Sequence, residues 1–128
     1  MQTAQTLEGR LANLTRRYLD AVPDRIAAIG ETLMHCQRES IDAATFLGRQ
    51  FHTLAGTAGT YGLLAVSAVA VEAEETCAAI EGRPIDDESF TYLKFLVGHL
   101  RALTGDREHP FTLIAGGNAA TVKGNAVA

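Results

Sequence analysis

The apolar residues of this chain recur every three or four positions, in five segments separated by helix-breaking or helix-capping residues. This spacing places each set on one side of an α-helix, whereas a half-buried strand would need alternation at every second residue. Alternation over the length of a strand is not found. Alanine and leucine also outnumber β-branched residues, which favours close-packed helices. The chain is therefore predicted to be all-α.

The first two segments are expected to form two helices. The first spans about residues 5–20, and Pro23 is expected to end it and to occupy the first turn of the second. The second helix then runs to about Arg38. The buried side of the first helix is predicted to consist of Leu7, Leu11, Leu14 and Tyr18.

The third and fourth segments follow the same rules. Ser40 or Asp42 can cap the third helix by accepting hydrogen bonds from its first backbone N–H groups. Gly62 suits the left-handed conformation that ends a helix. The fourth helix is predicted over about residues 63–81.

The fifth helix is expected to begin at Asp86 or Asp87 and to end at Gly105. With short loops, the five segments predict an antiparallel four-helix bundle with an additional short N-terminal helix packed across one end. We expect this bundle to occupy residues 1–108, because 128 residues suffice for one domain. Residues 109–128 lack helical periodicity and are expected to be a flexible tail or a linker.

Charge and hydropathy narrow the class of partner. The formal net charge is −4, and Arg16 and Arg17 are the only adjacent basic pair, so nucleic acid and anionic membranes are poor candidates. No signal sequence and no run of about 18 apolar residues is present. The sequence therefore predicts a cytoplasmic protein.

The third helix carries the most unusual local pattern of the chain. Its apolar side is predicted to consist of Leu47, Phe51, Leu54 and Ala58. His52 lies about a quarter turn or more away from that side. Small residues surround the histidine along the helix, and each glycine inside a helix costs about 1 kcal/mol relative to alanine. Such a surround makes sense if another backbone or a bulky group must come close to the ring. The small residues are Gly48, Ala55, Gly56 and Gly59.

An imidazole can bind metal, act in a catalytic triad or accept a group. No His-x-x-x-His, Glu-x-x-His or Cys-x-x-Cys spacing includes His52, so no metal site is expected. The chain also lacks Gly-x-Ser-x-Gly and any Cys/His signature of a nucleophilic enzyme. An exposed nucleophilic histidine that a partner approaches is the pattern of a phosphate acceptor.

The twelve residues that begin at His52, HTLAGTAGTYGL, resemble the signature of histidine-containing phosphotransfer (Hpt) domains, His-x-Leu-Lys-Gly-Ser-x-Gly. The predicted helices over residues 5–105 are also similar to the bundle of that family. The resemblance implies that His52 exchanges a phosphoryl group with aspartates of response-regulator receiver domains or within a hybrid sensor histidine kinase. It further implies that the chain is a phosphocarrier that has no kinase activity of its own and binds neither a cofactor nor a nucleotide. The Mg²⁺ ion would belong to the partner receiver, and an accessible His52 makes a monomer the simpler expectation.

The resemblance also assigns residues around the histidine. Gly48, Gly56 and Gly59 would give the partner room. Ala55 departs from the family pattern, because a lysine commonly stands there and places its ammonium beside the phosphate. Arg49, one turn before His52, is the nearest sequence-local substitute, although a solvated arginine is the simpler explanation.

Glu74 in the fourth helix lies at the edge of the apolar side. It could hold one ring nitrogen of His52 by a hydrogen bond and leave the other free to attack, or it could belong to a solvated charged face. Two rival functions stay open. One is a pseudo-Hpt adapter that binds a receiver without carrying phosphate, as the missing lysine at Ala55 would suggest. The other is a helical interaction domain in which the histidine is incidental.

Overall fold

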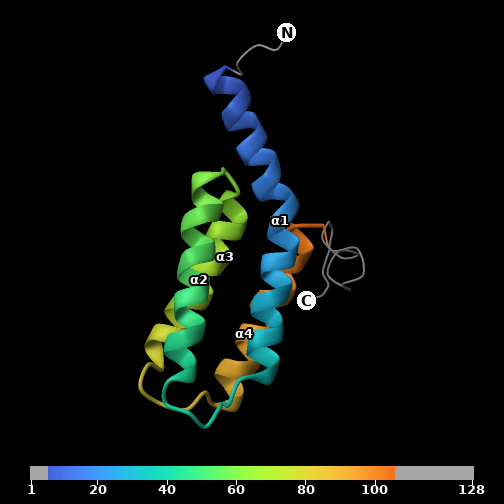
Figure 1. Cartoon of the computed structure of the whole chain (residues 1–128). Helices are drawn as coiled ribbons and strands as arrows, with labels where there is room; N and C mark the ends of the chain where they lie inside the picture. The colour runs from blue at the N-terminus through green and yellow to red at the C-terminus, as the bar shows by residue number, and fades with distance from the viewer. Residues whose placement is uncertain (1–5, 106–128) are drawn as a thin grey trace.

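A computed structural model describes residues 6–105 of the chain, which form four helices. Figure 1 shows that the helices run alternately up and down, and each packs against its two neighbours in a closed ring. The all-α prediction and the antiparallel four-helix arrangement are confirmed. The tail predicted for residues 109–128 lies outside the described residues. The helices are α1 (Leu7–His35), α2 (Ala43–Thr60), α3 (Leu64–Ala79) and α4 (Asp87–Leu103).

The prediction of an additional short N-terminal helix over residues 5–20 was wrong, because α1 runs without a break through Pro23. Proline lacks the N–H that would bond the carbonyl of Leu19, at a cost of about 3 kcal/mol. Burial of one large apolar side chain contributes about 1.5–3 kcal/mol, and several flank the proline on the same side of the helix. Packing therefore outweighs the lost bond. The buried side chains are Tyr18, Val22, Ile26, Ile29 and Leu33.

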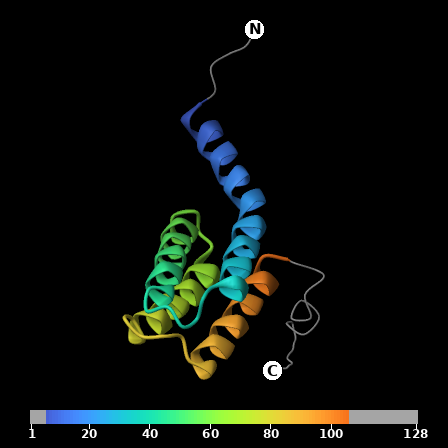
Figure 2. The same ribbon diagram turned by 60° about the horizontal axis from the view of Figure 1, so that its bottom comes forward.

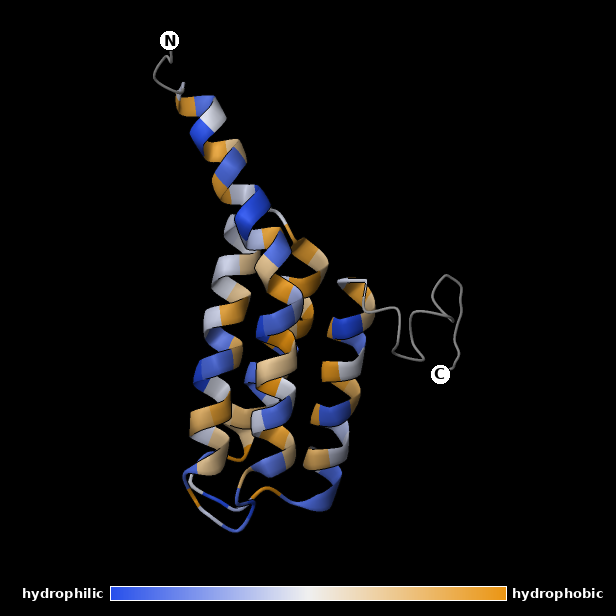
Figure 3. Ribbon diagram, turned by 45° about the vertical axis from the view of Figure 1, so that its right-hand side comes forward, coloured by the Kyte–Doolittle hydropathy of each residue, from blue (hydrophilic) through white to orange (hydrophobic). Residues whose placement is uncertain are grey.

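The N-terminal part of α1 projects beyond the other helices (Figures 1 and 2). Tyr18 stacks on Tyr61, in the turn between α2 and α3, with ring centroids 4.5 Å apart. The bundle ends at this level, so the turns of α1 before it have no helix beside them. Leu7, Leu11 and Leu14 are exposed, and their predicted burial was wrong. Figure 3 shows the resulting mixture of hydrophobic and hydrophilic residues on the projecting part.

The apolar sides predicted for the other helices form the core. In α2 the four predicted residues from Leu47 to Ala58 are all buried. In α4, Phe90 is half-buried, and Leu93, Val97 and Leu100, which share its side of the helix, are buried. Gly30 of α1 faces α4, where an added Cβ would lie 3.3 Å from Val97 Cγ1, so glycine permits the close contact of these helices. The buried set in and just after α3 is Val66, Ala70, Ala73, Cys77 and Ile80.

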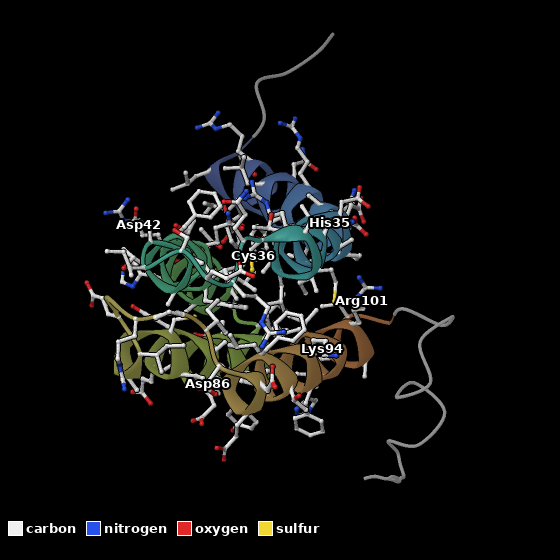
Figure 4. The ribbon with its side chains drawn as sticks, turned by 90° about the horizontal axis from the view of Figure 1, so that it is seen from below. His35, Cys36, Asp42, Asp86, Lys94 and Arg101 are labelled. Carbon is white, nitrogen blue, oxygen red and sulfur yellow. The ribbon has the colours of Figure 1, made fainter. Side chains whose placement is uncertain are left out.

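The loops at the lower end are joined by Arg38, and Figure 4 shows this end of the bundle. The Arg38 guanidinium contacts Asp87 and lies over the Phe90 ring, 4.3 Å from its centroid. The Arg38 carbonyl also accepts a hydrogen bond of 2.9 Å from the N–H of Ile85. The α1–α2 loop is therefore fixed to the α3–α4 loop, which sets the lower ends of α1 and α4.

The helix ends agree in most respects with the sequence. Asp86 caps α4, because its carboxylate accepts a hydrogen bond of 2.7 Å from the N–H of Ser89. Gly62 follows α2 with a φ of 84°, as predicted. Asp42 precedes α2, but its side chain makes no capping bond. None of the helices within residues 6–105 is long and apolar enough to cross a membrane.

Candidate functional site

His52 lies on the outer side of α2, and its side chain is 75% exposed. Its neighbour Phe51 is fully buried, since successive residues of a helix point about 100° apart. The core therefore holds the backbone at His52 while the ring stays accessible. The ring lines a groove of about 570 Å³ between α2 and α3, which we call the α2–α3 groove.

Glu74 of α3 contacts the histidine ring, as the sequence predicted it could. The distance between His52 Nδ1 and Glu74 Oε2 is 2.9 Å. An ionised carboxylate only accepts hydrogen bonds, so Nδ1 carries the proton and donates it. In the neutral ring, Nε2 then keeps its lone pair. The contact leaves one nitrogen of an exposed imidazole as a nucleophile.

Two of the glycines near His52 lie at the contact between α2 and α3. A Cβ added to Gly48 would lie 3.3 Å from Cys77 Cβ, and one added to Gly59 would lie 3.4 Å from Ser67 Oγ. The Ser67 hydroxyl donates a hydrogen bond of 2.8 Å to the carbonyl of Ala55, which also joins these helices. Close packing of another backbone, one of the two explanations that the sequence left open, therefore accounts for Gly48, and Gly59 lies in ordinary contact with α3.

Gly56 has a different environment. No atom outside its own helical surroundings lies within 4 Å of the position that a Cβ would take, so the space above it is open. It follows His52 by one turn and is exposed. Ala55, its neighbour, is buried and presents little side chain to an approaching partner. Of the small residues near the ring, Gly56 is the one whose open space favours the approach of another molecule.

Arg49 lies one turn before His52 and lines both the α2–α3 groove and a second groove of about 400 Å³ between α1 and α2. We call the second one the α1–α2 groove. The exposed side chain of Phe46 contributes apolar surface to it, and Arg25 of α1 joins Arg49 there. Arg25 was not predicted from the sequence. It stands 24 positions before Arg49, and only the packing of α1 against α2 brings the two residues to one groove.

The described residues contain little that could hold a metal. Among residues 6–105, no group of three or more His, Cys, Asp or Glu side chains is arranged to bind one. Cys77 lines the α2–α3 groove, but burial raises the pKa of its thiol to about 11. At neutral pH this thiol is therefore protonated, and it is a poor nucleophile or metal ligand.

Comparison with protein families matches residues 13–103 to the Hpt domain. The matched range includes α2, α3, α4 and the packed part of α1, together with His52 and Glu74. It starts within the projecting part of α1 and so leaves out Leu7 and Leu11. No curated protein and no solved structure matches the chain.

Proposed function

Because the chain belongs to the Hpt domain family, a family of phosphotransfer intermediates rather than kinases, we propose that His52 is its phosphorylated residue. His52 takes a phosphoryl group from the aspartyl phosphate of one receiver domain and passes it to the aspartate of another. The observation that supports this most directly is the hydrogen bond between His52 Nδ1 and Glu74, on a ring that is 75% exposed.

The proposed step needs no base in this chain. The lone pair of His52 Nε2 attacks the phosphorus atom, and the bond from phosphorus to the aspartyl oxygen breaks. The electron pair of that bond stays on the partner's carboxylate. Nδ1 keeps its proton throughout, and the negative Glu74 offsets the positive charge that develops on the ring. The reverse step returns the phosphoryl group to a second aspartate.

Positioning accounts for most of what the chain contributes, as is general for phosphoryl transfer. Glu74 fixes the ring orientation and the tautomer, so that Nε2 faces the partner. Gly56 leaves open space one turn after the ring. Arg49 supplies a positive charge one turn before the ring, since Ala55, one turn after the ring, stands where the family usually has a lysine.

The test is phosphotransfer from a panel of phosphorylated receiver domains, detected by intact mass at neutral or mildly alkaline pH. Wild type is expected to gain one phosphoryl group, and His52→Gln is expected to gain none. His35 and His99 are exposed and lie outside the site, so His35→Gln and His99→Gln are matched controls that should behave as wild type. Phosphorylation of the His52→Gln variant would overturn the assignment.

One observation favours the alternative of an adapter that binds receivers without carrying phosphate. Position 55 holds a buried alanine, so the cation that usually accompanies the phosphohistidine is missing there. The same panel separates the two functions. Receiver binding without any mass gain on wild type would establish the adapter, and transfer to His52 would exclude it.

A further inference from the structure

The two grooves beside His52 carry opposite charge. Glu74 and Glu81 line the α2–α3 groove. Arg25 and Arg49 line the α1–α2 groove, and its other lining residues include no acidic side chain. Arg49 lines both grooves, so it lies at the border between them. The surface around the ring is therefore acidic toward α3 and basic toward α1.

The two arginines of the α1–α2 groove have no counterion within residues 6–105. Neither makes an ion pair, a hydrogen bond or a ring contact there, in contrast to Arg38, which pairs with Asp87. Both guanidiniums are exposed, and each keeps all five N–H donors available. Two like charges at one groove repel each other, which an anionic ligand would relieve.

The orientation of the ring agrees with this polarity. The two nitrogens of an imidazole point to different sides of the ring. Because Nδ1 faces the carboxylate of Glu74, Nε2 faces away from the acidic side of the surface. An incoming aspartyl phosphate carries about two negative charges and would be repelled by Glu74 and Glu81. The charge on the surface and the direction of the nucleophile therefore both favour approach from the side away from Glu74.

We propose that the α1–α2 groove receives the partner that carries the aspartyl phosphate, with Arg25 and Arg49 as the residues that select it. This inference rests on the proposed function of His52. The guanidiniums bind the anionic groups of the partner, since planar paired donors match carboxylate and phosphate oxygens. The exposed side chain of Phe46 offers an apolar surface to the same partner. Arg49 supplies the positive charge that position 55 lacks.

The experiment measures the rate of phosphoryl transfer from a phosphorylated receiver to His52 in Arg25→Ala, Arg49→Ala and the double variant. Arg16→Ala removes the same charge from the projecting part of α1 and is the matched control. At low ionic strength we expect the double variant to be slower by about tenfold, and the difference should shrink as salt is added. Each single variant should lose part of the rate, and Arg16→Ala should match wild type.

Two further arms separate a binding role from a structural one. The Arg25→Lys/Arg49→Lys variant keeps both charges and should recover most of the rate. Phosphorylation of His52 by phosphoramidate, a small donor that needs no docking, should be equal in wild type and Arg25→Ala, because Arg25 does not line the groove that His52 lines. A loss with phosphoramidate as well would show that the substitution disturbs the site itself, which would overturn the docking role.

The remaining outcomes are also decisive. A double variant as fast as wild type at low salt, with wild type fully phosphorylated, would overturn the inference and leave the function of His52 standing. A loss confined to Arg49→Ala would overturn the assignment of Arg25. Sedimentation that showed a dimer of wild type, weakened in the double variant, would assign the groove to a second copy of the chain instead. Wild type that accepts phosphate from no donor would overturn the proposed function itself.

Discussion

The two sides of α2 have opposite environments although they share one backbone. The inner side is formed by the apolar set from Leu47 to Ala58, all of it buried. On the outer side, His52 is exposed and the space above Gly56 is open. Since only the angle around the helix axis separates them, one short segment carries both the core contacts and the residue that we propose to be phosphorylated. Substitutions on the two sides should therefore have separable effects.

His52→Gln should give the largest effect on the outer side. It should remove all phosphoryl transfer, whereas the free energy of unfolding should stay within about 0.5 kcal/mol of wild type, because the ring is exposed. Urea denaturation beside the transfer assay measures both quantities. A variant that lost stability as well would show that the outer side is not independent of the core.

Phe51→Ala is the matched change on the inner side, at the adjacent residue. The ring is fully buried, so its removal should lower the free energy of unfolding by about 3–5 kcal/mol. At a temperature where the variant is still folded, His52 should accept phosphate as wild type does. Unchanged stability by denaturant titration would contradict the observed burial.

Gly56→Leu and Gly48→Leu compare a glycine on the open side of α2 with one at the contact between α2 and α3. Leucine at position 56 meets open space, so the fold should be kept or slightly stabilised, by up to about 1 kcal/mol from helix propensity. Transfer from a receiver should nevertheless be obstructed. Leucine at position 48 would collide with Cys77 and should lower the melting temperature. Normal transfer in Gly56→Leu would refute the proposed approach over this residue.

Glu74→Gln should give the smallest effect, because an amide oxygen can still accept a hydrogen bond from Nδ1–H. A hydrogen bond to a charged acceptor is stronger than one to a neutral acceptor by about 1 kcal/mol, which corresponds to roughly a fivefold slower transfer. Stopped-flow measurement of transfer at several pH values would detect it. Glu75→Gln, a neighbouring exposed carboxylate without a bond to the ring, is the control.

The parts of the fold that depend on a single helix were predictable from the sequence. The buried sets of α2 and α3, the cap at Asp86 and the exposure of His52 each follow from local spacing. The prediction failed where the outcome depends on what lies beside a helix. The spacing of Leu7, Leu11 and Leu14 suits a buried helix side, but no other helix lies beside them. Pro23 is accommodated within α1 because the residues before and after it pack into the core.

The residues of the candidate site also differ in whether nearby sequence or the packing of the helices reveals them. His52 stands out because of the residues next to it in the chain, and the contact with Glu74 was foreseen from its place on the next helix. Arg25 gave no signal, since no short-range spacing relates it to His52. Gly48 and Gly59 were noticed, but their contacts with α3 became visible only once the two helices were packed.

The packing at Gly48 links the distance between α2 and α3 to the orientation of the His52 ring. In the antiparallel pair of α2 and α3, Gly48 faces Cys77 one turn away from the point where His52 meets Glu74. A methyl group at position 48 would lie 3.3 Å from Cys77 Cβ, so α3 would have to move by a few tenths of an ångström, and the hydrogen bond between His52 Nδ1 and Glu74 would lengthen with it. The small volume of Gly48 thus sets the distance between α2 and α3, and with it the length of the hydrogen bond that orients His52. Selection for transfer rate would act on that residue even where selection for stability did not.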